Sequence, residues 1–434
     1  MENFKATEYT LKCVATEHEF EDTGWVLEDK ECEEPSLVRA IYKNKKLQLK
    51  GSDYGFYTFC DWLPVRRMLK GSAAPVTYRS EGLAKHLGLK NLYITLNGYS
   101  PKHGANMTTC SFKETEAYSV CGRMGDEKRV LVVASAGNTA RAFAKVCSEN
   151  NIPLLLSVPA DNLSAMWFEK PINPCVKLIA CEKGGDYFDA IYLSDLVLKS
   201  PHFYAEGGAK NVARRDGMAT TVLSAATTIG HIPDYYFQAV GSGTGAIAAW
   251  EANMRLKEDG SYGQNTMKLM VSQNAPFVPM YDAWRADSRA MLPYDATKAR
   301  RDAAIIDAKV LSNRKPPYPI KGGLYDALKA TDGEILVATN AQARKAAKLF
   351  EELEGVDIHP AAAVATATLI KAVQDGKVEK GATIMLNITG AGEQAFKSSH
   401  DVFELKPAKL FSLKATAEEV IEAVEEMFKE YINE

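Results

Sequence analysis

The sequence lacks the features that mark membrane, secreted or nucleic-acid-binding proteins. No stretch approaches the ~20 consecutive apolar residues that a membrane-spanning helix needs. Residues 1–18 carry charges throughout and contain no apolar run after a basic start, so we expect no signal peptide. Because 52 Lys and Arg residues face 55 Asp and Glu residues, the net charge of -3 supplies no basic field for nucleic acid or anionic lipid.

Paired cysteines are also missing. None of the eight cysteines stands in a tight Cys-x-x-Cys pair, which favours a reduced, cytoplasmic chain over a disulfide framework. Cys13 and Cys32 stand alone near the N-terminus, whereas a zinc ribbon needs two close pairs. We therefore expect no metal site.

What is present indicates a layered α/β protein. The chain has 434 residues, too many for one hydrophobic core, so we expect two domains and a smaller appendage. Residues 1–60 alternate short apolar runs with charges and predict a small, partly β appendage. Further on, short apolar strands alternate with helices, which predicts parallel sheets covered on both faces. The expected strands are 91–95, 129–134, 152–158, 176–180, 235–240, 269–272, 334–338 and 383–388.

Two further segments complete this outline. Residues 273–330 are rich in Pro, Arg and Asp and form the least regular stretch, which could be a lid, an interface arm or loops over the main sheet. Residues 415–431 predict a helix, with Thr416 as a possible cap and an apolar stripe of helical spacing.

Four motifs carry candidate chemistry, and the first is Ser111-Phe112-Lys113. A lysine is usually a solvated surface charge. This one follows a loop of small and polar residues, 104–110, and opens an expected helical segment. A partly desolvated lysine at the edge of a cleft can lose its proton and bind a carbonyl carbon covalently.

The second motif follows the apolar strand 129–134 and is made of small residues. A strand-to-helix turn with a capping side chain explains it, and so does an anion site. Small residues let backbone N–H groups approach a carboxylate at a helix N-terminus. The residues are Ser135, Ala136, Gly137, Asn138 and Thr139.

The third motif is a glycine turn between the strand 235–240 and an expected helix over 246–256. Glycines there permit positive φ and close approach of the backbone to a phosphate, although a tight turn without a ligand has the same pattern. It is neither a Walker loop nor a dinucleotide fingerprint, so a small monophosphate is the better hypothesis. The turn comprises Gly241, Ser242, Gly243, Thr244 and Gly245.

The fourth motif is Thr389 in a glycine turn after the strand 383–388. A strand followed by such a turn needs no function. In an open parallel sheet, however, ligands sit at the carboxyl ends of the strands. Thr389 could present its hydroxyl there.

The order of these four motifs resembles that of the fold-type II pyridoxal phosphate enzymes, and threonine synthases in particular. The segments 62–65, 74–77, 83–89 and 91–93 are similar to the entry region of that family, and 211–217 to its Asn-x-x-Arg-x-x-Gly segment. The chain departs from threonine synthases near the lysine, where Glu114-Thr115-Glu116 replaces Asp-Arg-Gly, and at His359-Pro360, which replaces Glu-Pro.

A longer resemblance is to the cysteate synthase family. It rests on long, unusual strings spread over much of the chain: 97–101, 109–114, 206–215, 237–245 and 322–328. The resemblance implies a pyridoxal phosphate enzyme that converts O-phospho-L-serine and sulfite to L-cysteate and phosphate, for coenzyme M synthesis. Threonine synthase, a phosphoserine-dependent cysteine synthase and a catalytically silent relative remain as alternatives.

The same resemblance implies a fold, an assembly and residue roles. We expect two parallel-sheet α/β domains with the cofactor cleft between them: residues 100–230, and residues 61–99 together with 231–434. A homodimer or higher homo-oligomer is implied. Lys113 is expected to bind the cofactor covalently and act in catalysis; Asn138, 241–245 and Thr389 are expected to bind the cofactor. Substrate binding is expected from Ser135, Ala136, Gly137, Thr139, Asn211 and Arg214.

Overall fold

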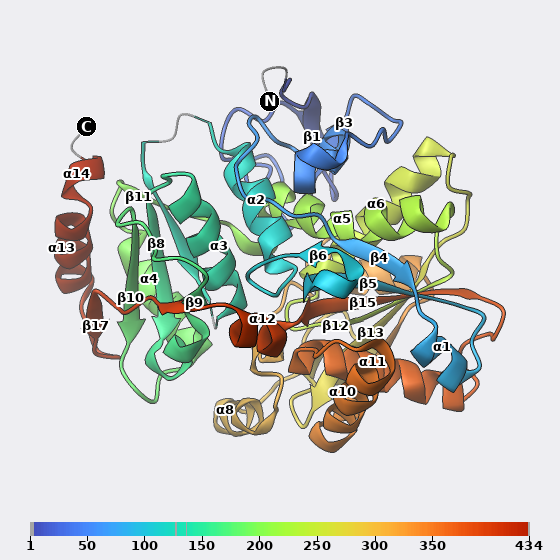
Figure 1. Ribbon diagram of the computed structural model, residues 1–434. Coiled ribbons are helices and arrows are strands. Elements are labelled where there is room, and N and C mark those ends of the chain that lie inside the picture. The colour runs from blue at the N-terminus through green and yellow to red at the C-terminus, as the bar shows by residue number, and fades with distance from the viewer. Residues whose placement is uncertain (1–3, 126–127, 136, 433–434) are drawn as a thin grey trace.

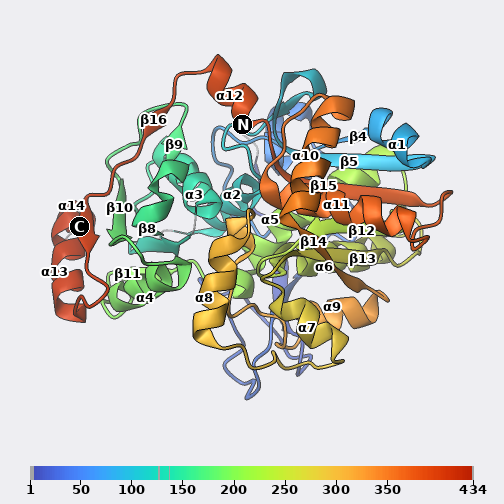
Figure 2. The same ribbon diagram turned by 90° about the horizontal axis from the view of Figure 1, so that it is seen from below.

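Two parallel sheets and a small antiparallel one organise the molecule (Figures 1 and 2). The structure is a computed structural model, and it describes residues 4–125, 128–135 and 137–432. Within these residues no helix is long and apolar enough to cross a membrane.

The smaller parallel sheet has five strands in the order β11-β7-β8-β10-β17. Its strands other than the edge strand β17 are almost wholly buried because helices cover them, as a parallel sheet requires. The strands are β7 (Val130–Ala134), β8 (Leu154–Pro159), β10 (Val176–Cys181), β11 (Phe203–Ala205) and β17 (Lys409–Phe411). The helices around it are α2 (Lys113–Arg123), α3 (Asn138–Glu149), α4 (Tyr187–Val197) and α13 (Ala417–Met427).

The larger sheet runs β14-β13-β12-β15-β5-β4, with β6 paired to β5. All neighbours are parallel except β4 and β6, which run antiparallel to β5. The strands are β4 (Val76–Arg79), β5 (Asn91–Ser100), β6 (Ala105–Asn106), β12 (Tyr235–Ala239), β13 (Lys268–Ala275), β14 (Glu334–Thr339) and β15 (Thr383–Ala391). The main helices beside it are α5 (Val212–Ile229), α6 (Thr244–Asp259), α10 (Asn340–Glu354) and α11 (Pro360–Gln374), with α1 (Gly82–Leu87) and α12 (Glu393–Ser399) at its margins.

The N-terminal sheet is antiparallel and packs on α5 and α6 at the top of Figure 1. Its strands are β1 (Tyr9–Cys13), β2 (Glu19–Phe20) and β3 (Val38–Tyr42), and a 3₁₀ segment, Ser52–Trp62, leads on to the larger sheet. A partly β appendage was predicted for this region, and the sheet agrees with that pattern.

The parallel α/β fold was predicted and is confirmed, with each expected strand present. Two details differ. The stretch 273–330 is not simply irregular: it contains α7 (Pro279–Arg285), α8 (Ala296–Ile305) and α9 (Leu324–Ala330). The C-terminal helix is interrupted, because α14 (Lys429–Ile432) follows α13 as a separate turn.

The predicted domain division stays a prediction, and one segment lies outside it. We expected 231–434 to belong with the larger sheet. Strand β17 instead pairs with β10 of the five-stranded sheet, and α13 packs on α4. The chain therefore returns to the smaller sheet at its end, because β17 extends that sheet and the apolar stripe of α13 covers it.

Candidate active site

The segment that carries Lys113 is hydrogen-bonded to β15, an inner strand of the larger sheet. Phe112 donates its backbone N–H to the carbonyl of Thr389 at 3.0 Å, and an antiparallel bridge joins Ser111 to Gly390. Lys113 is the first residue of α2. These bonds bring two of the four motifs, 111–113 and 389–390, together.

The glycine turn lies at the same edge of that sheet. Strand β12 ends at Ala239, just before the turn, and it is the parallel neighbour of β15, which ends after Thr389. Parallel neighbours present their carboxyl ends at one edge, where open α/β sheets hold ligands. Three motifs thus converge on this edge.

The amine of Lys113 sits among charged side chains. Its Nζ lies 3.0 Å from Oε2 of the buried Glu116, whose Oε1 lies 3.4 Å from Nη1 of Arg214. Burial lowers the pKa of Lys113, Glu116 opposes that effect and Arg214 adds to it. The pKa of Lys113 is lowered overall, and a lower pKa favours the neutral amine, which is the form that attacks a carbonyl carbon.

Arg214 is held by two carboxylates. Its Nε donates to Oε1 of Glu206 at 2.8 Å, and a second hydrogen bond joins Nη2 to Oε2. Burial opposes the charge of Arg214, but Glu116 and Glu206 outweigh it and raise the pKa of the guanidinium. The predicted phosphate role of Arg214 stays a prediction, and a phosphate would have to share this guanidinium with two anions.

Asn211, another predicted substrate ligand, caps helix α5. Its side-chain oxygen accepts hydrogen bonds from the N–H of Ala213 and from Nη1 of Arg123, both at 3.0 Å, and its Nδ2 donates to the carbonyl of Glu206 at 2.7 Å. This buried amide therefore stabilises the start of α5, and its substrate role stays a prediction.

The small-residue turn leads into helix α3 as expected. Gly137 has φ of 145°, and its N–H donates to Oγ of Ser135 at 3.0 Å. Ala136 lies outside the described residues. Nη2 of Arg141 donates to the side-chain oxygen of Asn138 at 3.1 Å. Because that oxygen is occupied, the amide NH₂ of Asn138 is left to donate to a ligand.

The glycine turn opens α6 without a capping side chain. Gly243 has φ of 82°, and a Cβ there would lie 2.9 Å from Leu324. Among the described residues, the backbone N–H groups of Gly241, Ser242 and Gly243 have no hydrogen-bond partner. Free N–H groups at the start of a 16-residue helix form a cradle for an anion such as phosphate.

Sequence reasoning missed two carboxylates at this site. Glu116 was noted only as a departure from the threonine synthase pattern, although a residue three positions after Lys113 on a helix faces it. Glu393 was not singled out: its Oε2 lies 3.0 Å from Nε2 of His359 and 3.6 Å from Nη2 of Arg141. Burial alone would raise the pKa of Glu393, but His359 and Arg141 bring it well below its ordinary value.

Residues 73–390 match the sequence model of the family of pyridoxal-phosphate dependent enzymes. The chain belongs to this family. Among curated proteins, it is 45% identical over 410 residues to the cysteate synthase of Methanosarcina barkeri, covering 94% of this chain and 96% of that protein. It is 46% identical over 402 residues to the cysteate synthase of Methanosarcina mazei, covering 92% and 95%.

Solved structures of the family share the fold at low identity. Maize serine racemase superposes with a TM-score of 0.57 at 15% identity, covering 75% of this chain and 91% of that one. Threonine deaminase isoform 2 of Solanum lycopersicum superposes with a TM-score of 0.54 at 17% identity, covering 75% and 86%. These structures confirm the predicted fold class, and the family match over residues 73–390 confirms pyridoxal phosphate as the predicted cofactor.

The residues present fit this cofactor. Within the part of the chain that the structure describes, the N–H groups of 241–243 are unpartnered and suit its phosphate. The amide NH₂ of Asn138 suits its ring oxygen, and a lysine with a lowered pKa suits its aldehyde. No group of three or more metal-ligating side chains is found among the described residues.

Proposed function

We propose that this pyridoxal phosphate enzyme converts O-phospho-L-serine and sulfite to L-cysteate and phosphate. The observation that carries the proposal is the identity of about 45%, over more than nine-tenths of the chain, to proteins named cysteate synthase. The cofactor, when bound, supplies a conjugated ring that takes up the electrons of the bond broken at the substrate α-carbon.

Lys113 is proposed to move the proton of that carbon. Its Nζ removes the α-proton and later returns it, which requires an amine that can be neutral near pH 7. Burial of the side chain favours this form. Glu116, 3.0 Å away, accepts a hydrogen bond from Nζ while the amine is protonated and keeps it beside the reaction centre.

The cofactor roles are assigned to the turns, and the convergence of three motifs at one sheet edge supports them. The glycine turn 241–245 binds the phosphate and Asn138 the ring oxygen. The hydroxyl of Thr389 would lie beside the ring nitrogen of the bound cofactor. A neutral hydroxyl there does not enforce a protonated ring, which suits replacement at the β-carbon better than transamination.

Substrate roles are assigned to the other predicted residues. Ser135, Ala136, Gly137 and Thr139 bind the substrate carboxylate at the start of α3, where the helix dipole favours an anion. Arg214, near Asn211, is proposed to receive the departing phosphate because a guanidinium matches phosphate oxygens in pairs.

Product analysis tests the proposal. The purified holoenzyme is given phosphoserine with sulfite or with sulfide, and in a separate reaction O-phosphohomoserine alone. We expect cysteate and phosphate in the first reaction at a rate well above that of cysteine or threonine formation. Faster cysteine formation from sulfide would favour a cysteine synthase instead, and threonine from O-phosphohomoserine would favour threonine synthase.

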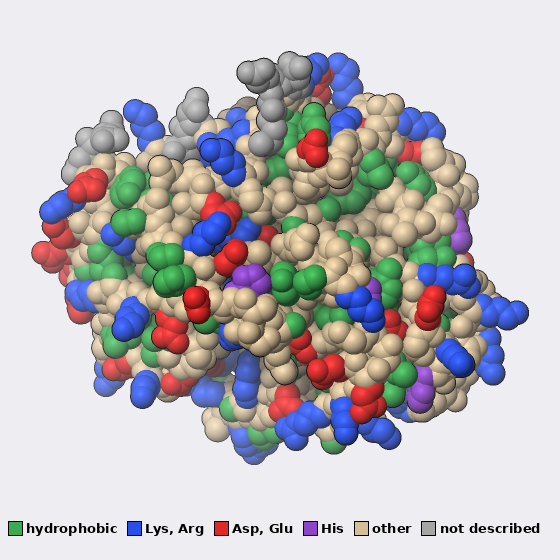
Figure 3. Space-filling view, in the orientation of Figure 1, with side chains coloured by type: hydrophobic (Ala, Val, Ile, Leu, Met, Phe, Trp, Pro, Cys, Tyr) green, Lys and Arg blue, Asp and Glu red, His purple; other side chains and the backbone are tan. Residues whose placement is uncertain are grey.

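We also propose a cytoplasmic, homo-oligomeric protein whose other partners are small anions. The eight cysteines are free thiols, as in a reducing compartment. The face in Figure 3 mixes Lys and Arg with Asp and Glu side chains, which offers no basic field for nucleic acid. Analytical ultracentrifugation tests the assembly, and a single species of about 48 kDa would contradict it.

A further inference from the structure

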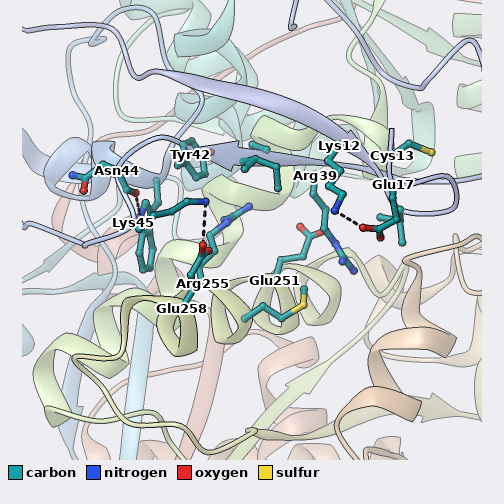
Figure 4. A pocket seen from close by; sticks show the side chains of 15 residues that line it. Lys12, Cys13, Glu17, Arg39, Tyr42, Asn44, Lys45, Glu251, Arg255 and Glu258 are labelled. Carbon is teal, nitrogen blue, oxygen red and sulfur yellow. Dashed lines mark hydrogen bonds and ion pairs between the residues drawn. The ribbon is translucent and has the colours of Figure 1, made fainter. Parts of the chain in front are cut away.

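A cavity of about 200 Å³ lies between the N-terminal sheet and helix α6 (Figure 4). Strands β1 and β3 form one wall and α6 forms the other. From the glycine turn at Thr244 to Glu251, the helix advances seven residues, or about 10 Å at 1.5 Å per residue. The cavity is therefore separate from the cofactor cleft.

The lining side chains carry more positive than negative charge. Four are cationic and three are anionic. Most cations have a carboxylate of their own: Arg255 lies 2.6 Å from Asp216, Lys45 lies 3.2 Å from Glu258, and Lys12 pairs with Glu17. The excess positive charge must therefore reside elsewhere in the lining.

Arg39 carries that excess. Among the described residues, Glu251 is the one carboxylate in ion-pair contact with Arg39, and it divides its two oxygens between Nε of Arg39 at 3.2 Å and Nε of the buried Arg215 at 2.9 Å. Figure 4 shows Arg39 and Glu251 side by side in the cavity. One carboxylate thus forms ion pairs with two largely buried guanidinium groups.

One donor of Arg39 is left over. Its Nη2 is buried and has no hydrogen-bond partner among the described residues. The guanidinium carbon lies 4.5 Å from the centre of the Trp250 ring, which holds the group in place. Buried donors in proteins normally have partners, so the guanidinium of Arg39 has unused hydrogen-bonding capacity in the wall of the cavity.

Other lining side chains are apolar and could contact the hydrocarbon part of an organic ligand. Val14, Ile41, Trp62 and Met254 contribute to the walls. An apolar cavity of about 150 Å³ can hold benzene, so this one has room for a ring of that size together with a charged head group.

We propose that this cavity binds a small organic oxyanion, a carboxylate, sulfonate or phosphate ester, whose head group pairs with Arg39 and whose body lies against Trp62 and Met254. An oxyanion oxygen accepts a hydrogen bond from the guanidinium of Arg39, which lines the cavity. It also neutralises the charge that Glu251 only half balances.

Isothermal titration calorimetry of the holoenzyme with benzenesulfonate, and separately with inorganic sulfate, tests the site. We expect saturable binding of one benzenesulfonate per chain and weaker binding of sulfate, which lacks the apolar body. Arg39→Gln should weaken benzenesulfonate binding at least tenfold. Met254→Trp, which fills the cavity without changing charge, should abolish it.

Two controls locate the binding. Arg344→Gln removes a guanidinium that pairs with Asp307 at the exposed surface, and it should bind as the wild type does. Lys113→Ala should also retain binding, because the active site is not involved. Absence of saturable binding to the folded wild type, or equal affinity of wild type, Arg39→Gln and Met254→Trp, would overturn the proposal. Neither result depends on whether cysteate is formed.

Discussion

The lysine of this site works in a buried group of alternating charges. Glu116 lies between the amine of Lys113 and the guanidinium of Arg214, and Glu206 holds Arg214 from the other side. Burial and Arg214 lower the pKa of Lys113, whereas Glu116 raises it. On the proposed mechanism, this balance lets one amine act as a nucleophile, a base and an acid in turn.

Replacing the lysine tests its role directly. Lys113→Ala should reduce kcat at least about a thousandfold, as expected when the group that moves a proton is lost. Borohydride reduction followed by peptide mass spectrometry should label residue 113 in the wild type only. Lys371→Ala, at an exposed position, should leave both results unchanged. Near-normal turnover of Lys113→Ala would refute the assignment.

Replacing the neighbouring carboxylate should move a pH profile. Glu116→Gln removes the negative charge that raises the pKa of Lys113, so that pKa should fall. The neutral amine then persists at lower pH, and the acidic limb of the profile of kcat, which reports the enzyme with substrate bound and Lys113 released from the cofactor, should shift to lower pH. An unchanged limb with a lower kcat would mean that Glu116 only supports Arg214.

The sequence predicted the motifs at this scale better than the contacts between them. Lys113, the glycine turn and Thr389 were identified from their order, and the sheet brings their segments to one edge. The pairing of Arg214 with two carboxylates could not be read from the sequence. Such a contact depends on how α2 and α5 pack against each other, and no local pattern encodes that packing.

At the scale of elements, helix α6 links the two proposed sites. Just before its first turn lie the N–H groups of residues 241–243, which have no partner among the described residues, and its middle carries Glu251 and Arg255 to the cavity. The helix needs positive φ immediately before it starts, at Gly243. Other residues adopt that conformation at a cost of about 1 kcal/mol or more.

This requirement gives a prediction for cofactor affinity. Gly243→Ala adds a Cβ at positive φ, 2.9 Å from Leu324, so the turn should shift and bind pyridoxal phosphate about tenfold more weakly. Equilibrium dialysis of the apoenzyme measures this. Gly376→Ala is the matched control, because it has φ of 70° but no atom within 4 Å of the new Cβ. Equal affinity of both variants for pyridoxal phosphate would contradict the proposal that the glycine turn binds its phosphate.

The elements themselves were largely predictable, because buried parallel strands appear as continuous apolar runs. Strand β17 was missed: it has three residues and no periodic signal. The helices of 273–330 were missed because they are short and flanked by Pro, Arg and Asp residues. Their positions depend on the surfaces they cover.

For the molecule as a whole, the N-terminal sheet is joined to the body by buried charges. Arg123 of α2 donates from Nε and Nη2 to the carboxylate of Asp22, at 3.0 and 2.9 Å. Tyr42 of β3 donates to Asp216 of α5. Burial opposes the charge of Arg123, but Asp22 outweighs it and raises the pKa. The small sheet is thus packed into the core of the molecule and is not a separate attachment.

Breaking one of these connections should therefore destabilise the whole protein. Asp22→Ala leaves the guanidinium of Arg123 buried without its carboxylate, which typically costs about 3–5 kcal/mol. Urea unfolding followed by circular dichroism should show the loss as a lower midpoint. Glu8→Gln, which breaks exposed ion pairs in the same sheet, should leave the midpoint unchanged because exposed pairs contribute little. If Asp22→Ala were as stable as Glu8→Gln, the sheet would be an independent attachment.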